Sequence, residues 1–137
     1  MFCDASGSPP ILAATIFDGL KILYTVLEVP TWFTDRLCPR DDEYIMGLEL
    51  AAITLGLETL RPTCIDASIT VWTDNAGGEG ALRRGSSSAP DYNAIVHITW
   101  KKALQLRAGK LFIFPLLHFR AHLYEVYSSD ECHLNLT

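Results

Sequence analysis

The sequence has no long run of apolar residues and no leader-like segment. Its longest apolar stretch, residues 111–117, is far shorter than the roughly 20 residues that a helix needs to cross a bilayer. No charged segment followed by an apolar stretch, the pattern of a secretory signal peptide, occurs near residue 1. These absences exclude a membrane span and predict no membrane partner.

Cysteine is scarce and forms no local pairs. The four cysteines, Cys3, Cys38, Cys64 and Cys132, are widely spaced and make no Cys-x-x-Cys motif. Scattered cysteines in a chain of this size are typical of reduced thiols rather than of a disulfide framework. We therefore expect an intracellular protein, cytoplasmic or nuclear.

Several motifs of well-known sites are also missing. The glycine-rich residues 77–80 are not followed by Gly-Lys-Ser/Thr, which excludes a phosphate-binding loop of that type. No Asp-Thr-Gly or Asp-Ser-Gly triplet of an aspartic protease is present. The histidines and the cysteine of residues 118–133 lack a second tight ligand spacing, which disfavours a zinc site.

The composition is that of a single globular domain. A chain of 137 residues, 49% hydrophobic and 20% charged, is long enough to bury a core. We assign residues 1–117 to this domain. Residues 118–137 form an atypical C-terminal tail whose pattern predicts no clear element.

Apolar patterns and turn residues predict an α/β domain with a mixed five-stranded sheet flanked by helices. The Asp-Gly pair at residues 18–19 is typical of a hairpin turn, so the first three strands should form an antiparallel meander. The expected strands are residues 1–6, 11–17, 22–29, 68–73 and 111–117. The expected helices are residues 41–60, 75–84 and 88–108.

Residues at the expected helix ends carry signals of their own. Asp41 and Asp42 stand at the start of the first helix, where acids oppose the positive end of the dipole. Gly85 is placed to end the second helix. Ser88 and Asp91 resemble a capping box at the start of the third.

Positive charge is concentrated in one segment. Residues 83–120 hold seven of the eleven Lys and Arg residues and one acid, a net charge of +6, and the remaining four bases and fifteen acids give −11. A basic stripe of this kind can follow a phosphate backbone, although it is also compatible with a solvated helix face. The candidates for nucleic-acid contact are Arg83, Arg84, Lys101 and Lys102.

Three acids stand at positions where a carboxylate is unusual. Asp4 and Asp74 lie at or near the ends of expected strands, and Glu49 lies among apolar residues of the first helix. If they converge, they form an oxygen-rich site of the kind that Mg²⁺ prefers. Asp18 should lie away from them in the hairpin turn, and Glu58 should face solvent.

Three segments of the chain resemble a known family. "FCDASGSPPILAATIFDG", "YIMGLELAAITLGLETL" and "VWTDNAGGEGALRRGSSSAPDYNAIVHITW" are similar to the RNase H-like domain that follows reverse transcriptase in certain eukaryotic retrotransposons, over residues 1–114. The resemblance implies that Asp4, Glu49 and Asp74 are catalytic metal ligands for two Mg²⁺ ions. It also implies cleavage of the RNA strand of an RNA–DNA hybrid, and an upstream reverse transcriptase domain as partner.

The chain departs from this family at both ends. The family's fourth acid follows the fifth strand in a motif resembling Ser-x-x-Asn-x-Ala-Asp, whereas this tail offers only Asp130 and Glu131. The first expected strand also begins only three residues before Asp4, as in a fragment or a degraded gene copy. We therefore expect at most one tightly bound Mg²⁺ and a poor nuclease. Two alternatives stay open: an inactive remnant, and a DNA-directed nuclease of the same superfamily.

Overall fold

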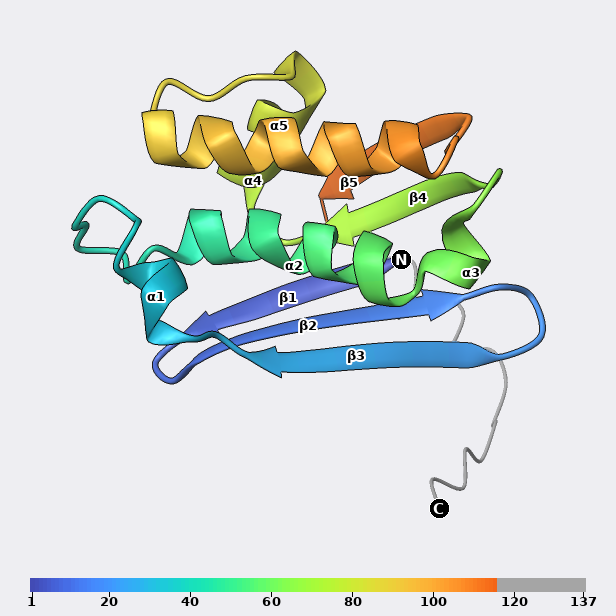
Figure 1. The fold of residues 1–137 in the computed structure, drawn as a ribbon, viewed down its shortest axis with the longest axis horizontal. Coiled ribbons are helices and arrows are strands. Elements are labelled where there is room, and N and C mark those ends of the chain that lie inside the picture. The colour runs from blue at the N-terminus through green and yellow to red at the C-terminus, as the bar shows by residue number, and fades with distance from the viewer. Residues whose placement is uncertain (116–137) are drawn as a thin grey trace, which may run out of the picture.

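The computed structural model describes residues 1–115, which form a five-stranded mixed sheet with helices packed against it (Figure 1). The strand order is β3-β2-β1-β4-β5. The strands are β1 (Phe2–Gly7), β2 (Pro10–Phe17), β3 (Ile22–Glu28), β4 (Ser68–Thr73) and β5 (Lys110–Pro115). The predicted fold class, α/β with a mixed sheet of five strands, is confirmed. The predicted tail, residues 118–137, lies outside the described residues.

The first three strands form the predicted antiparallel meander. The carboxylate of Asp18 accepts hydrogen bonds from the backbone N–H groups of Leu20 and Lys21, both at 2.9 Å. Gly19, which directly follows Asp18, has a φ of 95°, a conformation that residues with a Cβ rarely adopt. The Asp-Gly pair therefore forms the turn that the sequence predicts.

The remaining two strands run parallel to β1, and helices connect them. β1 pairs with β4 and β4 pairs with β5, both in parallel. The helices are α1 (Thr31–Thr34), α2 (Ile45–Thr59), α3 (Arg61–Cys64), α4 (Ala76–Arg84) and α5 (Pro90–Gln105). β5 lies at the second edge of the sheet.

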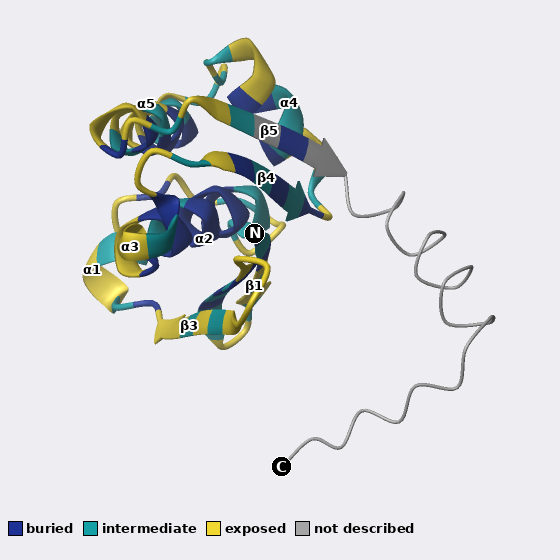
Figure 2. Ribbon diagram, turned by 90° about the vertical axis from the view of Figure 1, so that its right-hand side faces the viewer, coloured by how far each residue is buried: buried dark blue, intermediate teal, exposed yellow. Residues whose placement is uncertain are grey.

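Helix α2 is the centre of the core. It packs against β1 and β2 on one side and against α5 on the other, and most of its residues are buried (Figure 2). Leu48, Leu50, Ile53 and Leu57 of this helix are almost fully buried. Among the helices of the described part of the chain, none is long and apolar enough to cross a membrane.

Several predicted helix ends differ from the observed ones. α2 begins at Ile45 rather than at residue 41, because Glu43 and Tyr44 have positive φ values of 52° and 63°. Asp41 and Asp42 therefore lie outside its first turn, and the prediction that they oppose its dipole is wrong. The short helices α1 and α3 were not predicted, since four residues give too short a pattern to read.

The predicted capping box at Ser88 is also wrong, although the neighbouring helix is correctly predicted. α5 begins after Ala89 without a side-chain cap, and it ends at Gln105. Asp91 instead accepts hydrogen bonds from Arg40 and from the backbone N–H of Cys38. Asp91 thus bonds to residues about fifty positions away in the sequence instead of to the start of its own helix.

Candidate metal centre

The two aspartates are brought together by the register of two parallel strands. β1 and β4 pair through Phe2 and Trp72, whose rings stack with centroids 6.3 Å apart. Asp4 and Asp74 each lie two residues further along the chain. Asp4 lies within β1 and Asp74 directly follows the last residue of β4, so the parallel pairing brings the two residues to the same region of the sheet.

Glu49 reaches the same place from helix α2. One carboxylate oxygen, Oε1, accepts a hydrogen bond of 2.9 Å from the backbone N–H of Ala5 in β1. The other, Oε2, accepts one of 3.3 Å from the hydroxyl of Thr73 in β4. Glu49, only 2% exposed, therefore joins β1 and β4 through its side chain.

One oxygen from each of Asp4, Glu49 and Asp74 lies within 4.8 Å of the other two. The predicted convergence of these three carboxylates is confirmed. Ligand oxygens bind Mg²⁺ or Ca²⁺ at about 2.0–2.6 Å, so oxygens around one ion lie within about 5 Å of each other. The three side chains could therefore hold a divalent metal ion, and their all-oxygen chemistry suits a hard cation.

The electrostatics of the cluster favour a cation. Burial raises the pKa of Glu49 to about 7, and the charges of Asp74 and Asp4 contribute to this rise. The hydrogen bonds from Ala5 and Thr73 oppose the shift without cancelling it. A divalent ion would offset both the loss of solvent and the repulsion between carboxylates.

Asp18 and Glu58 lie away from the acid cluster, as predicted. Asp18 is bound within the β2–β3 turn. Glu58 is exposed and forms an ion pair with Lys102 at 2.5 Å. It follows Glu49 by nine residues, which corresponds to about 13 Å along the helix axis.

The small residues after Asp74 allow two helices to meet. Asn75 caps α4 by accepting a hydrogen bond of 2.8 Å from the N–H of Gly78. A Cβ at Gly77 would lie 3.2 Å from the sulfur of Met46, and one at Gly78 would lie 3.7 Å from Leu50. The glycines thus bring α4 close to the first turns of α2, beside the acid cluster.

The four candidate basic residues do not form one uninterrupted site. Arg83 pairs with Glu79 at 2.9 Å, and Lys102 pairs with Glu58. Within the described part of the chain, Arg84 and Lys101 are exposed and have no ion pair. The positive charge available for a ligand therefore rests mainly on Arg84 and Lys101.

Two groups of the site were not predicted from the sequence. The backbone N–H of Ala5 has no side-chain signature, so no pattern could have identified it. Thr73, 1% exposed, did carry a signal, because it is a polar residue at an inward position of a buried strand. Asp130 and Glu131, the expected sources of a fourth carboxylate, lie outside the described residues.

Comparison of the chain with protein-family profiles, with curated proteins and with solved structures found no match.

Proposed function

We propose that residues 1–117 are an RNase H-like domain of retroelement origin that binds Mg²⁺ and, if active, cleaves the RNA strand of an RNA–DNA hybrid. The observation that carries this proposal is the meeting of Asp4, Glu49 and Asp74 within 4.8 Å. The acids come from the first strand, the first long helix and the end of the fourth strand. The family that the sequence resembles has its metal ligands in this order.

The different exposure of the three acids supports metal-dependent chemistry. Asp4 and Asp74 are exposed, so their carboxylates can reach an ion and a phosphate from solvent. Hydrogen bonds from β1 and β4 fix the carboxylate of Glu49, so its oxygens have a defined position in the site. Bound Mg²⁺ ions would supply stabilisation of the attacking and leaving oxygens of the phosphodiester.

The proposal includes weak activity. Three acids suffice for one ion, and a second ion close to the first needs further oxygen ligands against their mutual repulsion. Asp130 and Glu131, the expected sources of such a ligand, lie outside the described residues. We expect at most one tightly bound Mg²⁺ and hybrid cleavage near background.

Nucleic acid and an upstream reverse transcriptase domain are the proposed partners. Recognition of a hybrid would rest on duplex shape, phosphates and 2′-hydroxyls rather than on base identity. Arg83, Arg84, Lys101 and Lys102 would contact phosphates, with Arg84 and Lys101 contributing most.

The test is a cleavage assay on the purified chain of residues 1–137, with hybrid and duplex DNA offered side by side in Mg²⁺ and in Mn²⁺. Weak metal-dependent cleavage of the hybrid that disappears in Asp74→Asn supports the proposal. Preference for duplex DNA would assign the domain to a DNA-directed nuclease. Absence of both cleavage and metal binding would identify an inactive remnant. Robust turnover in Mg²⁺ would show that the tail supplies a working ligand.

A further inference from the structure

Within the described residues, the outer edge of β3 has no neighbouring strand. β3 is the outermost strand, and in Figure 1 no described element lies beyond it. About half of the backbone N–H and C=O groups of such a strand point away from the sheet without a partner strand. Proteins usually protect edge strands with Lys, Pro or a bulge. The seven residues of β3 contain neither Lys nor Pro, and their pairing with β2 is continuous.

The face of β3 that points away from α2 is apolar and exposed. The pairing with β2 places Ile22, Tyr24 and Val26 on this face, and their exposed fractions are 68%, 75% and 60%. These side chains occupy alternate positions, so they form one continuous row along the edge. Such a row is unusual for the edge of a sheet in contact with water.

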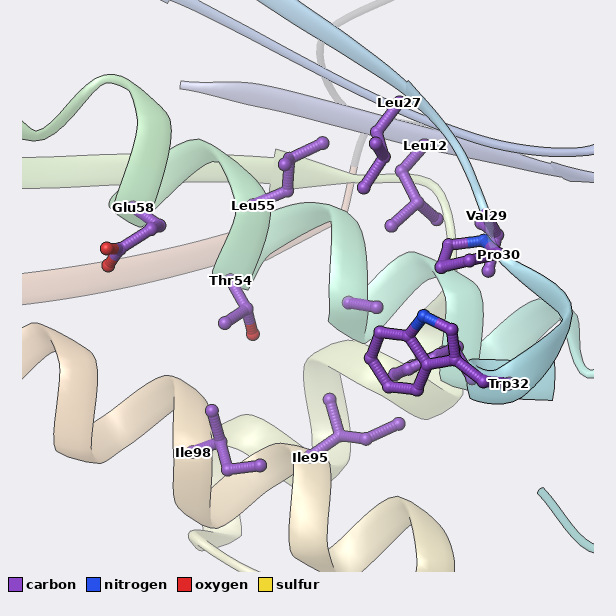
Figure 3. A pocket seen from close by; sticks show the side chains of 12 residues that line it. Leu12, Leu27, Val29, Pro30, Trp32, Thr54, Leu55, Glu58, Ile95 and Ile98 are labelled. Carbon is purple, nitrogen blue, oxygen red and sulfur yellow. The ribbon is translucent and has the colours of Figure 1, made fainter. Parts of the chain in front are cut away.

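The opposite face of β3 borders an apolar groove. Leu27 lies on this face and, with Trp32, Leu55 and Ile98, lines a cavity of about 290 Å³ between β3, α1, α2 and α5 (Figure 3). Leu27, Trp32 and Ile98 are all substantially exposed. A strand added beside β3 would therefore find apolar surface on both of its faces.

We propose that β3 pairs with β3 of a second copy of this chain. An antiparallel pair centred on Thr25 sets Tyr24 opposite the partner's Val26 and Leu23 opposite the partner's Leu27. Both faces of the added strand are then apolar, as the surface requires. The two sheets would form one continuous sheet of ten strands around a two-fold axis.

The charges near β3 fit this arrangement. Glu28 is the only charged residue of β3 and stands at its end. In the pair centred on Thr25, the two Glu28 residues are about 20 Å apart. Each Glu28 instead lies opposite the partner's Ile22, next to the partner's Lys21. Like charges therefore do not meet along this pair.

The available area predicts a dimer of moderate strength. The exposed side chains of Ile22, Tyr24, Val26, Leu27 and Trp32 offer on the order of 600 Å² per copy, given that an aromatic side chain buries about 150–250 Å². Stable interfaces bury about 800 Å² per partner. Backbone hydrogen bonds along the new pair add to the apolar contact, and we expect a dissociation constant in the micromolar range.

The first test is sedimentation equilibrium of the full chain over a range of concentrations. The wild type should approach twice the chain mass of 15.2 kDa, and no larger species should form because the two-fold contact closes. In the double variant Tyr24→Lys/Val26→Lys, each introduced ammonium group faces another across the contact, so the dissociation constant should rise at least about tenfold. Leu104→Lys, at an exposed apolar position of α5, is the matched control and should leave it unchanged.

A second test fixes the register. Thr25→Cys, made in a chain with Cys38→Ser and Cys132→Ser, should form a disulfide-linked dimer on mild oxidation. Directly opposed residues of an antiparallel pair have Cα atoms about 4.5–5.5 Å apart, a separation that a disulfide can span. Leu104→Cys in the same background should not cross-link. A monomer at all concentrations, a dimer unaffected by the β3 variant, or open-ended assembly would each overturn the proposal.

Discussion

The carboxylate of Glu49 lies between two strands, almost completely out of solvent. Its two hydrogen-bond donors, the Ala5 N–H and the Thr73 hydroxyl, fix its position but do not restore the solvation that it has lost. Its pKa, raised by burial and by Asp74 and Asp4 to about 7, is the measurable consequence. At the scale of single residues, the ionised carboxylate of Glu49 therefore has an unfavourable electrostatic energy, which a bound cation would reduce.

This penalty makes stability depend on pH with a definite sign. The folded chain binds the Glu49 proton more tightly than the unfolded chain, whose pKa is near 4.5, so ionisation destabilises the fold progressively between pH 4.5 and 7. Without metal, Glu49→Gln should match the wild type at low pH and exceed its unfolding free energy by about 3 kcal/mol above pH 7. Urea denaturation in EDTA across this pH range measures the difference.

Glu58→Gln is the control on the same helix, and its effect should have the opposite sign. Lys102 lowers the pKa of Glu58, so that carboxylate stabilises the fold above pH 4.5 and loses its contribution as pH falls. The variant should be slightly less stable than the wild type at neutral pH. A Glu49→Gln effect that does not change with pH would contradict the assignment of the raised pKa.

Metal binding is the second property that single residues decide. Mg²⁺ or Mn²⁺ should raise the melting temperature of the wild type, because a ligand at 100 times its dissociation constant adds about 2.7 kcal/mol of stability. Asp74→Asn should abolish this increase by removing one of the three ligands. Asp18→Asn should weaken the β2–β3 turn yet retain the full metal-dependent increase. Differential scanning calorimetry with and without metal tests both; an increase retained in Asp74→Asn would exclude the proposed centre.

At the scale of elements, the start of α2 is fixed by contacts with distant segments. Tyr92 of α5 lies against Gly47, two residues before Glu49, and a Cβ at Gly47 would come within 2.4 Å of its ring. The guanidinium of Arg40 stacks on the same ring at 3.9 Å and binds Asp91 through two hydrogen bonds. The Tyr92 ring is thus held between a cation and the helix that carries Glu49.

This packing predicts the effect of a methyl group at two helix positions. Gly47→Ala should destabilise the fold by about 1–3 kcal/mol, because the Tyr92 ring has no room to move and overpacking outweighs the gain in helix propensity of about 1 kcal/mol. Gly80→Ala should be neutral or stabilising, since the atoms nearest to its Cβ would belong to the flexible end of Arg84. Chemical denaturation measures both variants, and Tyr92→Leu should recover part of the stability that Gly47→Ala removes. Equal effects of the two alanines would refute the steric argument.

At the scale of the whole molecule, charge is divided between an acidic site and basic helices. Arg83 and Lys102 are engaged by Glu79 and Glu58, whereas Arg84 and Lys101 are exposed without an ion pair among the described residues. A phosphate backbone that binds Arg84 and Lys101 would therefore have no acidic side chain to displace.

The double variant Arg84→Ala/Lys101→Ala should therefore weaken hybrid binding more than Arg83→Ala/Lys102→Ala. The slope of log K against log salt should fall by about one unit for each phosphate that the variant no longer neutralises. Fluorescence anisotropy at several salt concentrations gives both quantities. Unchanged affinity and slope in the first variant would assign these side chains to a solvated surface.

The sequence by itself determined those features whose cause is local. Asp18 and Gly19 specify the β2–β3 turn, and Asn75 and Gly85 mark the two ends of α4, because a side-chain oxygen or a missing Cβ acts within a few residues. Local chemistry was also enough to single out the three acids.

Only the tertiary structure decided those features in which segments distant in the sequence compete for the same polar groups. Glu43 packs against Gly7, where a Cβ would lie 2.6 Å from its carboxylate, and the turn before α2 takes left-handed conformations that sequence propensity does not favour. Asp91 binds Arg40 rather than capping its own helix, because a charged, bidentate partner stabilises it more than a neutral N–H. The depth of Glu49 between β1 and β4 follows from such contacts, and only the folded chain contains them.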